Sequence, residues 1–255
     1  MELVYLILFF IFGLVFGSFY NVVGLRLCKG ESLISPGSHC VKCNHKLGPS
    51  ELIPVFSYIF LKGRCKKCKE KISIMYPVME LITGVLFALS YYVFGFDDQL
   101  ILALLMSSLF VIVVVTDLNY YIILDSILVI FGVLVFAYNI VTKGFMDACT
   151  YVLFGFIMFI FMFLLMKLGN IIFKEESLGG GDIKLLGVLG MTTNVFMSFI
   201  SLSLGAFLAL PGSLYFYLKK KDKIVPFGPF IIAGFLIMLF MQVSFSEIID
   251  FVTFI

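Results

Sequence analysis

Long apolar stretches decide what this chain can fold into, because a helix needs about 20 predominantly apolar residues to cross the hydrocarbon core of a bilayer. Seven stretches approach or exceed that length, and an eighth, residues 183–194, is shorter. Hydrophobic residues make up 62% of the 255-residue chain, well above the share in an ordinary soluble domain. We therefore expect an all-α polytopic membrane protein with about eight transmembrane helices. The seven long stretches are residues 3–25, 74–95, 99–116, 121–141, 147–168, 195–217 and 226–243.

The positions of the basic residues predict the orientation of these helices. Residues 26–73 form the only long polar block and hold ten of the eighteen Lys and Arg residues. If all eight segments cross, this block shares one side with the other basic loops, and every basic residue except Lys143 lies on or beside that side. Loops rich in Lys and Arg stay in the cytoplasm, so this side is predicted to be cytoplasmic, with both termini outside. The charge pattern thus reflects topology, and we expect the lipid bilayer, and no nucleic acid, as a partner.

The same argument favours a crossing by the short segment 183–194, because otherwise the basic cluster Lys219–Lys223 would lie outside. The chain starts with MELVY, which lacks the basic region of a secretory signal peptide. The first apolar segment is therefore expected to remain as a helix. This reading divides the chain into a first transmembrane helix at 1–25, a cytoplasmic module at 26–73 and a transmembrane domain at 74–255.

The polar block contains two cysteine pairs, Cys40-x-x-Cys43 and Cys65-x-x-Cys68, with 21 residues between them. Two such pairs can complete a tetrahedral four-sulfur site of the zinc-ribbon kind, so a structural zinc is the favoured interpretation. A reducing cytoplasm disfavours disulfides, although redox use and four unligated thiols remain as alternatives. His39 or His45 could also replace one cysteine as a ligand.

Carboxylates within or beside apolar segments are costly and therefore informative. Asp117 ends the third long segment, and Asp182 opens the short one, so the predicted topology places both at the same side and depth. Taken singly, Asp182 could be a helix N-cap and Asp117 a solvated boundary residue. When two carboxyl groups share one low-dielectric site, their pKa values move apart, so that one group acts as an acid and the other as a base. Such a pair can activate water for attack on an amide. Gly179 and Gly181 would let a substrate backbone approach Asp182, because glycine has no Cβ and tolerates positive φ.

Four further charged residues are candidates for supporting roles. Asp125 lies eight residues beyond Asp117, which on one continuous helix would place it in the same cleft, and it could equally bond a neighbouring helix. Lys184 could act on the pKa of Asp182 or could simply mark the inner side of the membrane. Glu80 and Arg26 could pair with each other at the inner ends of the first two long segments.

Six sequence blocks, in order, resemble the type IV prepilin peptidases, which are GxGD aspartic proteases, in the bacterial branch with an N-terminal cysteine module. Together they cover nearly the whole chain, which makes the resemblance far more specific than a single GxGD match. The blocks are GSFYNVVGLRL (17–27), SPGSHCVKC (35–43), GRCKKCKEKISIMYPVMELITG (63–84), TDLNYYIILD (116–125), GGGDIKLLGVLG (179–190) and VPFGPFIIAG (225–234).

The resemblance implies an enzyme of the bacterial cytoplasmic membrane. It would remove the short basic leader of prepilins or pseudopilins at the cytoplasmic side, for a type IV pilus, a competence system or protein secretion. By motif position the catalytic residues are Asp117 and Asp182. Many family members also methylate the new N-terminus with S-adenosylmethionine, and the methyltransferase expectation rests on the resemblance alone. The sequence does not indicate an oligomeric state.

Two positions depart from the family pattern, because each has another residue where the family usually has proline. They are Leu124, directly before Asp125, and Cys28, after the first segment. Neither change touches Asp117 or Asp182. The acidic pair Glu175 and Glu176 is a candidate contact for a basic leader. The main alternative function is an ion-coupled transporter that uses intramembrane carboxylates, but it leaves the cysteine pairs unexplained.

Overall fold

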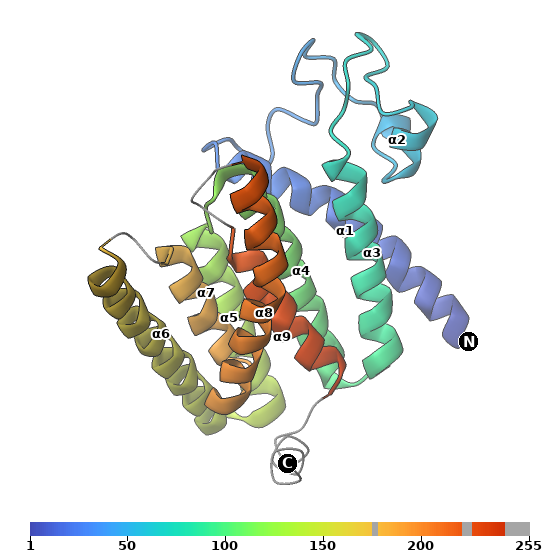
Figure 1. The fold of residues 1–255 in the computed structure, drawn as a ribbon. Helices are drawn as coiled ribbons and strands as arrows, with labels where there is room; N and C mark the ends of the chain where they lie inside the picture. Colours follow the sequence, from blue (N-terminus) through green and yellow to red (C-terminus); the bar gives the residue numbers. More distant parts are fainter. Residues whose placement is uncertain (175–177, 221–225, 243–255) are drawn as a thin grey trace. The chain divides into compact units, whose positions relative to one another are not determined.

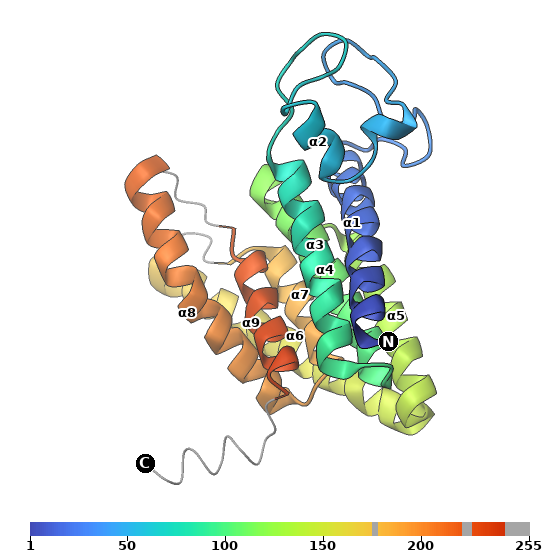
Figure 2. The same ribbon diagram turned by 90° about the vertical axis from the view of Figure 1, so that its right-hand side faces the viewer.

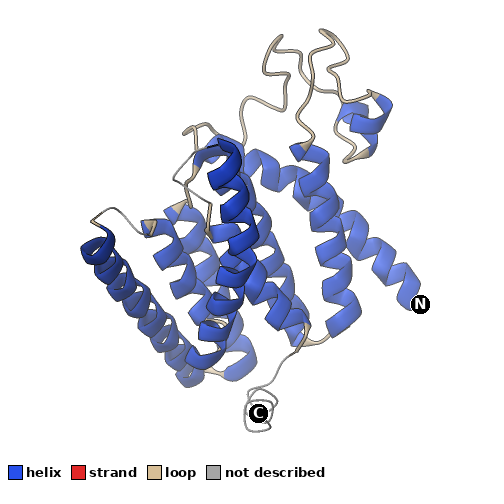
Figure 3. Ribbon diagram, in the orientation of Figure 1, coloured by secondary structure: helices blue, strands red, loops and turns tan. Residues whose placement is uncertain are grey.

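The computed structural model describes residues 1–174, 178–220 and 226–242, and these residues form helices and loops without a strand (Figure 3). Eight of the helices correspond to the eight predicted apolar segments, which confirms the all-α membrane architecture. Two short helical turns lie between the first two of them. In order, the elements are α1 (Glu2–Leu27), η1 (Pro49–Glu51), α2 (Phe56–Phe60), α3 (Met75–Phe94), α4 (Asp98–Tyr120), α5 (Asp125–Lys143), α6 (Phe145–Phe173), α7 (Gly180–Gly190), α8 (Val195–Lys220) and α9 (Gly228–Phe240) (Figure 1).

Six of these helices, α1, α3, α4, α5, α6 and α8, are long and apolar enough to cross a membrane. The other two are short, since α7 has 11 residues and α9 has 13. At 1.5 Å per residue, α7 is about 16 Å long. It begins at Gly180, earlier than the predicted segment at 183, because two of the three glycines belong to the helix. Glu175, Glu176, Lys221 and Lys223 lie outside the described residues.

The chain divides into two compact units, Met1–Leu100 and Ile101–Ile255. In the first unit α1 packs along α3 (Figure 2), and small residues make this close approach possible. Gly13 and Gly17 of α1 form a GxxxG pattern, which is typical of closely packed membrane helices. A Cβ on Gly13 would lie 2.5 Å from the Thr83 carbonyl oxygen, and one on Gly17 would lie 2.8 Å from the Glu80 Cα. The buried Asn21 adds a bond from its side-chain amide to the Tyr76 carbonyl, at 3.2 Å.

The second unit holds α4 beyond its first turn, together with α5 to α9. Its pairs of neighbouring helices include α5 with α6, α6 with α7, and α8 with α9. The α4 helix is the most buried of the six long helices, with fully enclosed side chains such as Met106 and Leu109. The buried side-chain amide of Asn139 on α5 donates a 2.8 Å hydrogen bond to the Met191 carbonyl, just after α7. This unit contains both aspartates of the predicted catalytic pair.

Candidate active site

Asp117 and Asp182 come from helix ends that meet within the second unit. Asp117 lies in the last turn of α4, and Asp182 lies in the first turn of α7. Both are buried, with 6% and 9% of their surface exposed. They are close enough for the charge of Asp117 to act on Asp182. The structure therefore brings together two carboxylates that are 65 residues apart in the sequence.

Asp182 does not occupy the N-cap position considered from the sequence. The N-cap of α7 is Gly179, so Asp182 is the third residue of the helix. Its carboxylate accepts a hydrogen bond from the Gly179 N–H, and its own N–H donates to the Gly179 carbonyl at 3.2 Å. This is half of a capping box, in which the third residue satisfies the N-cap amide. The carboxylate is thereby held at the beginning of α7.

Backbone conformation does not require the glycines before Asp182, because Gly179 has φ −70° and neither Gly180 nor Gly181 has positive φ. A Cβ on Gly181 would lie 2.8 Å from the Cβ of Ile123, in the loop between α4 and α5. A Cβ on Gly180 would meet nothing within 4 Å. The middle glycine therefore has space for a side chain, whereas the third does not.

Ile123 also touches the beginning of α9, which sequence reasoning did not include in the site. A Cβ on Gly228 would lie 2.7 Å from Ile123 Cδ1 and 3.3 Å from Asp117 Oδ2. The Gly228 N–H donates a hydrogen bond to the Asp117 carboxylate, as expected for the free amides and positive dipole end of a helix N-terminus. Within the described residues, Asp117 Oδ2 is buried and has no hydrogen-bond partner. The only sequence signal for Gly228 was its position in the VPFGPFIIAG block.

Asp125 in the first turn of α5 and Lys184 in the second turn of α7 form an ion pair. The Lys184 Nζ lies 2.7 Å from both carboxylate oxygens of Asp125, and both side chains are largely exposed. The helical spacing that would place Asp125 in the same cleft as Asp117 does not apply, because α4 ends at Tyr120 and the chain turns at Tyr121, whose φ is +55°. The eight-residue spacing from Asp117 therefore does not follow one helix. Lys184 pairs with Asp125 rather than with Asp182.

At both departures from the family pattern the backbone has a φ that proline could adopt. Leu124 is the N-cap of α5, with φ −75° and ψ 121°. Cys28, the C-cap of α1, has φ −62°. Both φ values lie within the range to which proline is restricted, but the Cys28 N–H donates a hydrogen bond that proline could not make.

The four cysteines of the first unit form a compact cluster. Their Sγ atoms all lie within 4.8 Å of one another, with 3.7 Å between Cys40 and Cys68 and 4.0 Å between Cys43 and Cys65. Four sulfurs placed tetrahedrally at 2.3 Å from a zinc ion would be about 3.8 Å apart, so the cluster fits such an ion. The separations are far longer than the 2.05 Å of a disulfide, and all four thiols are free.

Two similar turns build this cluster. In the first, the Cys40 N–H bonds to the His45 carbonyl at 2.9 Å; in the second, the Cys65 N–H bonds to the Glu70 carbonyl at 2.8 Å. Each turn has a residue with positive φ directly after its second cysteine, Asn44 at +53° and Lys69 at +61°. Hydrogen bonds from the backbone N–H groups of Cys43 and Lys42 lower the pKa of the Cys40 thiol to about 6, which favours the thiolate form that binds metal.

The histidines beside the cluster have other partners. The His39 ring lies 2.9 Å from the Gly37 carbonyl oxygen, through Nδ1. The His45 Nε2 lies 3.2 Å from Glu51 Oε2. Neither belongs to the group of possible metal ligands among the described residues, which consists of the four cysteines.

Glu80 and Arg26 do not pair with each other. Glu80 is buried on α3 and accepts hydrogen bonds from the Val55 N–H, at 2.7 Å, and from the Ser18 hydroxyl. Arg26 donates to two carbonyl oxygens of the following loop, at 3.0 Å to Ser32 and 3.3 Å to Gly37. Both residues therefore hold the cysteine module to the ends of α1 and α3.

Comparisons with known proteins identify the family of this chain. Residues 103–214 match the model of the type IV leader peptidase family, and residues 11–94 match the bacterial peptidase A24 N-terminal domain. The prepilin leader peptidase/N-methyltransferase of Bacillus subtilis (strain 168) is 37% identical over 230 residues, which cover 88% of this chain and 90% of the relative. A type 4 prepilin-like proteins leader peptide-processing enzyme of Escherichia coli O78:H11 is 30% identical, covering 91% and 93%. No solved structure matches the chain. These matches, which span both units, establish that the chain belongs to the type IV leader peptidase family.

Proposed function

We propose that Asp117 and Asp182 are the catalytic pair of an aspartic endopeptidase that removes the leader from prepilins or pseudopilins. Family membership decides for a prepilin peptidase over the ion-coupled transporter. The observation that carries the residue assignment is the meeting of two buried carboxylates at the ends of α4 and α7. Cleavage is assigned to residues 74–255, and metal binding to residues 26–73.

The chemistry needs one carboxyl group as a base and the other as an acid. In a buried pair only one group ionises readily, and the charged one takes a proton from water as the water attacks the scissile carbonyl. The protonated one donates to the leaving nitrogen. Asp117 Oδ2, which has no partner among the described residues, is the atom best placed to hold that water. The Gly228 and Gly179 N–H groups keep the two carboxylates in position.

The substrate approaches from the cytoplasmic side in this proposal. The prediction rests on the distribution of Lys and Arg, which favours a cytoplasmic location for the polar block and for the ends of α4 and α7. A prepilin carries its basic leader on that side and its apolar helix in the bilayer. The multi-pass membrane architecture supports this proposal, because the two parts of such a substrate meet at the membrane surface.

Zinc binding and methylation complete the proposal. Zinc would hold the two cysteine turns together, which matters because a module of about 50 residues has little core of its own. N-methylation with S-adenosylmethionine is supported by the names of the relatives, among them the Bacillus subtilis prepilin leader peptidase/N-methyltransferase. No residue of this chain is assigned to that cofactor.

The residue assignment is tested by expressing the protein with a prepilin and following removal of the leader. Wild type should cleave, and Asp117→Asn and Asp182→Asn should each abolish cleavage. Asp147→Asn is the matched control, because Asp147 is an exposed aspartate in the first turn of α6, and it should cleave normally. Cleavage that persists in either catalytic variant would refute the two-aspartate mechanism.

A further inference from the structure

The cysteine module exposes a continuous apolar segment, residues 52–60, which includes α2. Five of its nine side chains are large, apolar and 44% to 80% exposed, and Phe60 is the most exposed of them. Contiguous apolar surface of this kind marks a site of contact with a protein or a membrane. The five residues are Leu52, Ile53, Phe56, Ile59 and Phe60.

A hydrogen bond fixes the position of this apolar segment along the axis of α3. The Val55 N–H donates to Glu80 Oε2 at 2.7 Å, and Glu80 lies five residues after Met75, the start of α3. Five residues advance about 7.5 Å along a helix, and helical side chains point back toward the N-terminus. Val55 therefore lies beside the first turns of α3. Because α3 has 20 residues and is about 30 Å long, these turns lie at the boundary of the hydrocarbon core.

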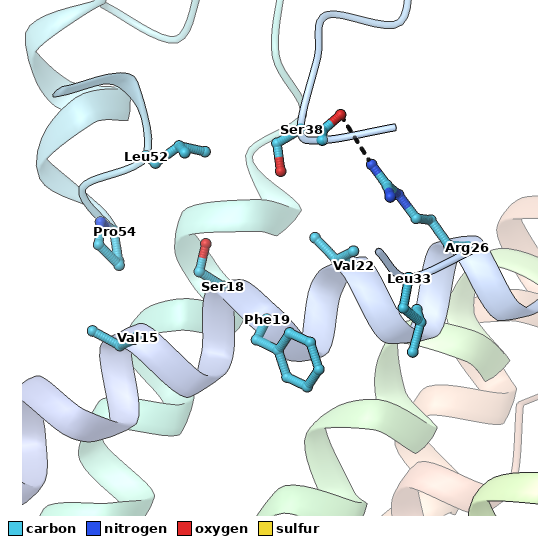
Figure 4. A pocket seen from close by; sticks show the side chains of 10 residues that line it. Val15, Ser18, Phe19, Val22, Arg26, Leu33, Ser38, Leu52 and Pro54 are labelled. Carbon is cyan, nitrogen blue, oxygen red and sulfur yellow. Dashed lines mark hydrogen bonds between the residues drawn. The ribbon is translucent and has the colours of Figure 1, made fainter. Parts of the chain in front are cut away.

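The apolar segment also lies next to exposed apolar side chains of α1. A pocket of about 360 Å³ lies between them, with Leu52 and Pro54 on one wall and Val15 and Phe19 on the other (Figure 4). Val15 and Phe19 are 54% and 50% exposed on a helix that is long and apolar enough to cross the bilayer. Apolar side chains of α1 and of the module thus line one pocket, which they share with the polar side chains of Ser18, Arg26 and Ser38.

The residues that follow the apolar segment carry positive charge. Lys62, Arg64, Lys66 and Lys67 are all exposed and come within seven residues of Phe60. Aromatic and apolar side chains next to lysine and arginine are typical of segments that lie in the membrane interface, because the basic groups are attracted to anionic headgroups. The charge therefore favours lipid over an apolar protein surface as the partner.

We propose that residues 52–60 insert into the interfacial layer of the bilayer and anchor the cysteine module to the membrane. In this arrangement Phe56, Ile59 and Phe60 lie at the boundary between headgroups and acyl chains. The hydrogen bonds to Glu80 hold the segment at that depth. The module is then a membrane-bound platform beside α1 and α3 and does not extend freely into the aqueous phase.

The test uses the absence of tryptophan from the chain. Phe60→Trp introduces one fluorescent probe in the apolar segment, and Val41→Trp introduces the matched control in the first cysteine turn, at a position that is 84% exposed. Each variant is reconstituted into vesicles that contain phospholipids brominated near the headgroup end of the acyl chain. Quenching by bromine should be several-fold stronger for Phe60→Trp than for Val41→Trp. The emission maximum of Phe60→Trp should also lie at a shorter wavelength than that of Val41→Trp.

Equal and weak quenching of the two variants would overturn the proposal. Weak quenching of Phe60→Trp together with a blue shift on addition of a prepilin would also overturn it, in favour of a peptide-binding surface. If Phe60→Trp does not fold, Phe56→Trp places the probe at a second exposed position of the segment. Equal zinc content and equal circular dichroism verify that the compared variants are folded. No readout depends on peptidase activity, so the result is independent of the proposed function.

Discussion

Ile123 fills the space between two glycines, and this leads to a prediction that distinguishes them. Gly181→Ala and Gly228→Ala each add one methyl group against the same isoleucine, but against different atoms of it. The alanine Cβ at position 181 would meet Ile123 Cβ at 2.8 Å, and the one at position 228 would meet Ile123 Cδ1 at 2.7 Å. Ile123→Val removes Cδ1 and keeps Cβ. It should therefore rescue Gly228→Ala and leave Gly181→Ala impaired.

The magnitude follows from these distances. Carbon atoms in contact lie about 3.5 Å apart or more, so each added methyl group requires a displacement of about 0.7 to 0.8 Å. Overpacking of this kind costs about 1–3 kcal/mol of stability. A misplacement of about 1 Å in an active site can reduce the rate about 100-fold, so each alanine variant should cleave about 10-fold to 100-fold more slowly. Rescue of Gly228→Ala should be incomplete, because its Cβ also lies 3.2 Å from Val113 Cγ1 and 3.3 Å from Asp117 Oδ2.

The assay is the initial rate of leader removal from a prepilin in reconstituted membranes, with thermal unfolding measured in parallel. Gly180→Ala is the internal control, since its Cβ meets nothing within 4 Å and alanine is favoured over glycine in a helix by about 1 kcal/mol. It should cleave like wild type. Ile123→Val alone should cost only about 0.5–1.5 kcal/mol. Rescue of both alanine variants by Ile123→Val, or of neither, would refute the assignment of the two glycine contacts to different atoms of Ile123. A Gly180→Ala variant that cleaves as slowly as Gly181→Ala would also refute the reasoning.

Three further predictions concern the groups around the site and in the module. Lys184→Met and Asp125→Asn should each lower stability by no more than about 1 kcal/mol, because exposed ion pairs contribute little; a thermal shift larger in the double variant than in either single one would contradict a shared pair. Zinc uptake at pH 7 should release fewer than four protons from the four cysteines, because the pKa of Cys40 is about 6 and its thiol is already mostly ionised. Release of four protons, measured with a pH indicator, would contradict this. Cys65→Ser should lower the zinc content. Glu80→Ala should destabilise the module by about 1–3 kcal/mol, because it leaves the Val55 N–H unpaired. Proteolysis near residue 55 should be faster in Glu80→Ala than in Glu80→Gln, because glutamine keeps an acceptor oxygen.

The helices were predictable because the length of each apolar stretch reports directly on what can cross a bilayer. The segment predicted at 121–141 starts four residues early, since residues 121–124 are apolar but form the turn that carries Ile123. Hydropathy cannot separate an apolar loop from the first turn of an apolar helix. A positive φ at Tyr121, rather than any glycine or proline, ends α4 there, and such a turn has no strong sequence signal.

The proximity of Asp117 and Asp182 was predictable because intramembrane carboxylates are rare and the distribution of basic residues predicts one depth for both. The contacts around the pair were not. Ile123, Gly181 and Gly228 lie far apart in sequence and meet only because α5, α7 and α9 begin at the same place. The ion pair of Lys184 with Asp125 likewise spans 59 positions. Periodicity reports on one helix at a time, so contacts between helix ends are invisible to it.

The short helices and the buried carboxylates depend on each other. At about 16 and 20 Å, α7 and α9 are too short to span a hydrocarbon core of about 30 Å, and helix N-termini within that depth need partners for their free N–H groups. Asp117 and Asp182 supply them, to Gly228 and Gly179. Each aspartate thus has a structural role beside its proposed chemical one. Asparagine keeps an oxygen that can accept the bond, whereas Asp117→Ala leaves the buried Gly228 amide unpaired at about 1–3 kcal/mol. Asp182→Ala should cost less, because Gly179 is exposed. Loss of cleavage therefore reports on the chemistry only in the asparagine variants, and the added destabilisation of Asp117→Ala and Asp182→Ala measures the structural part.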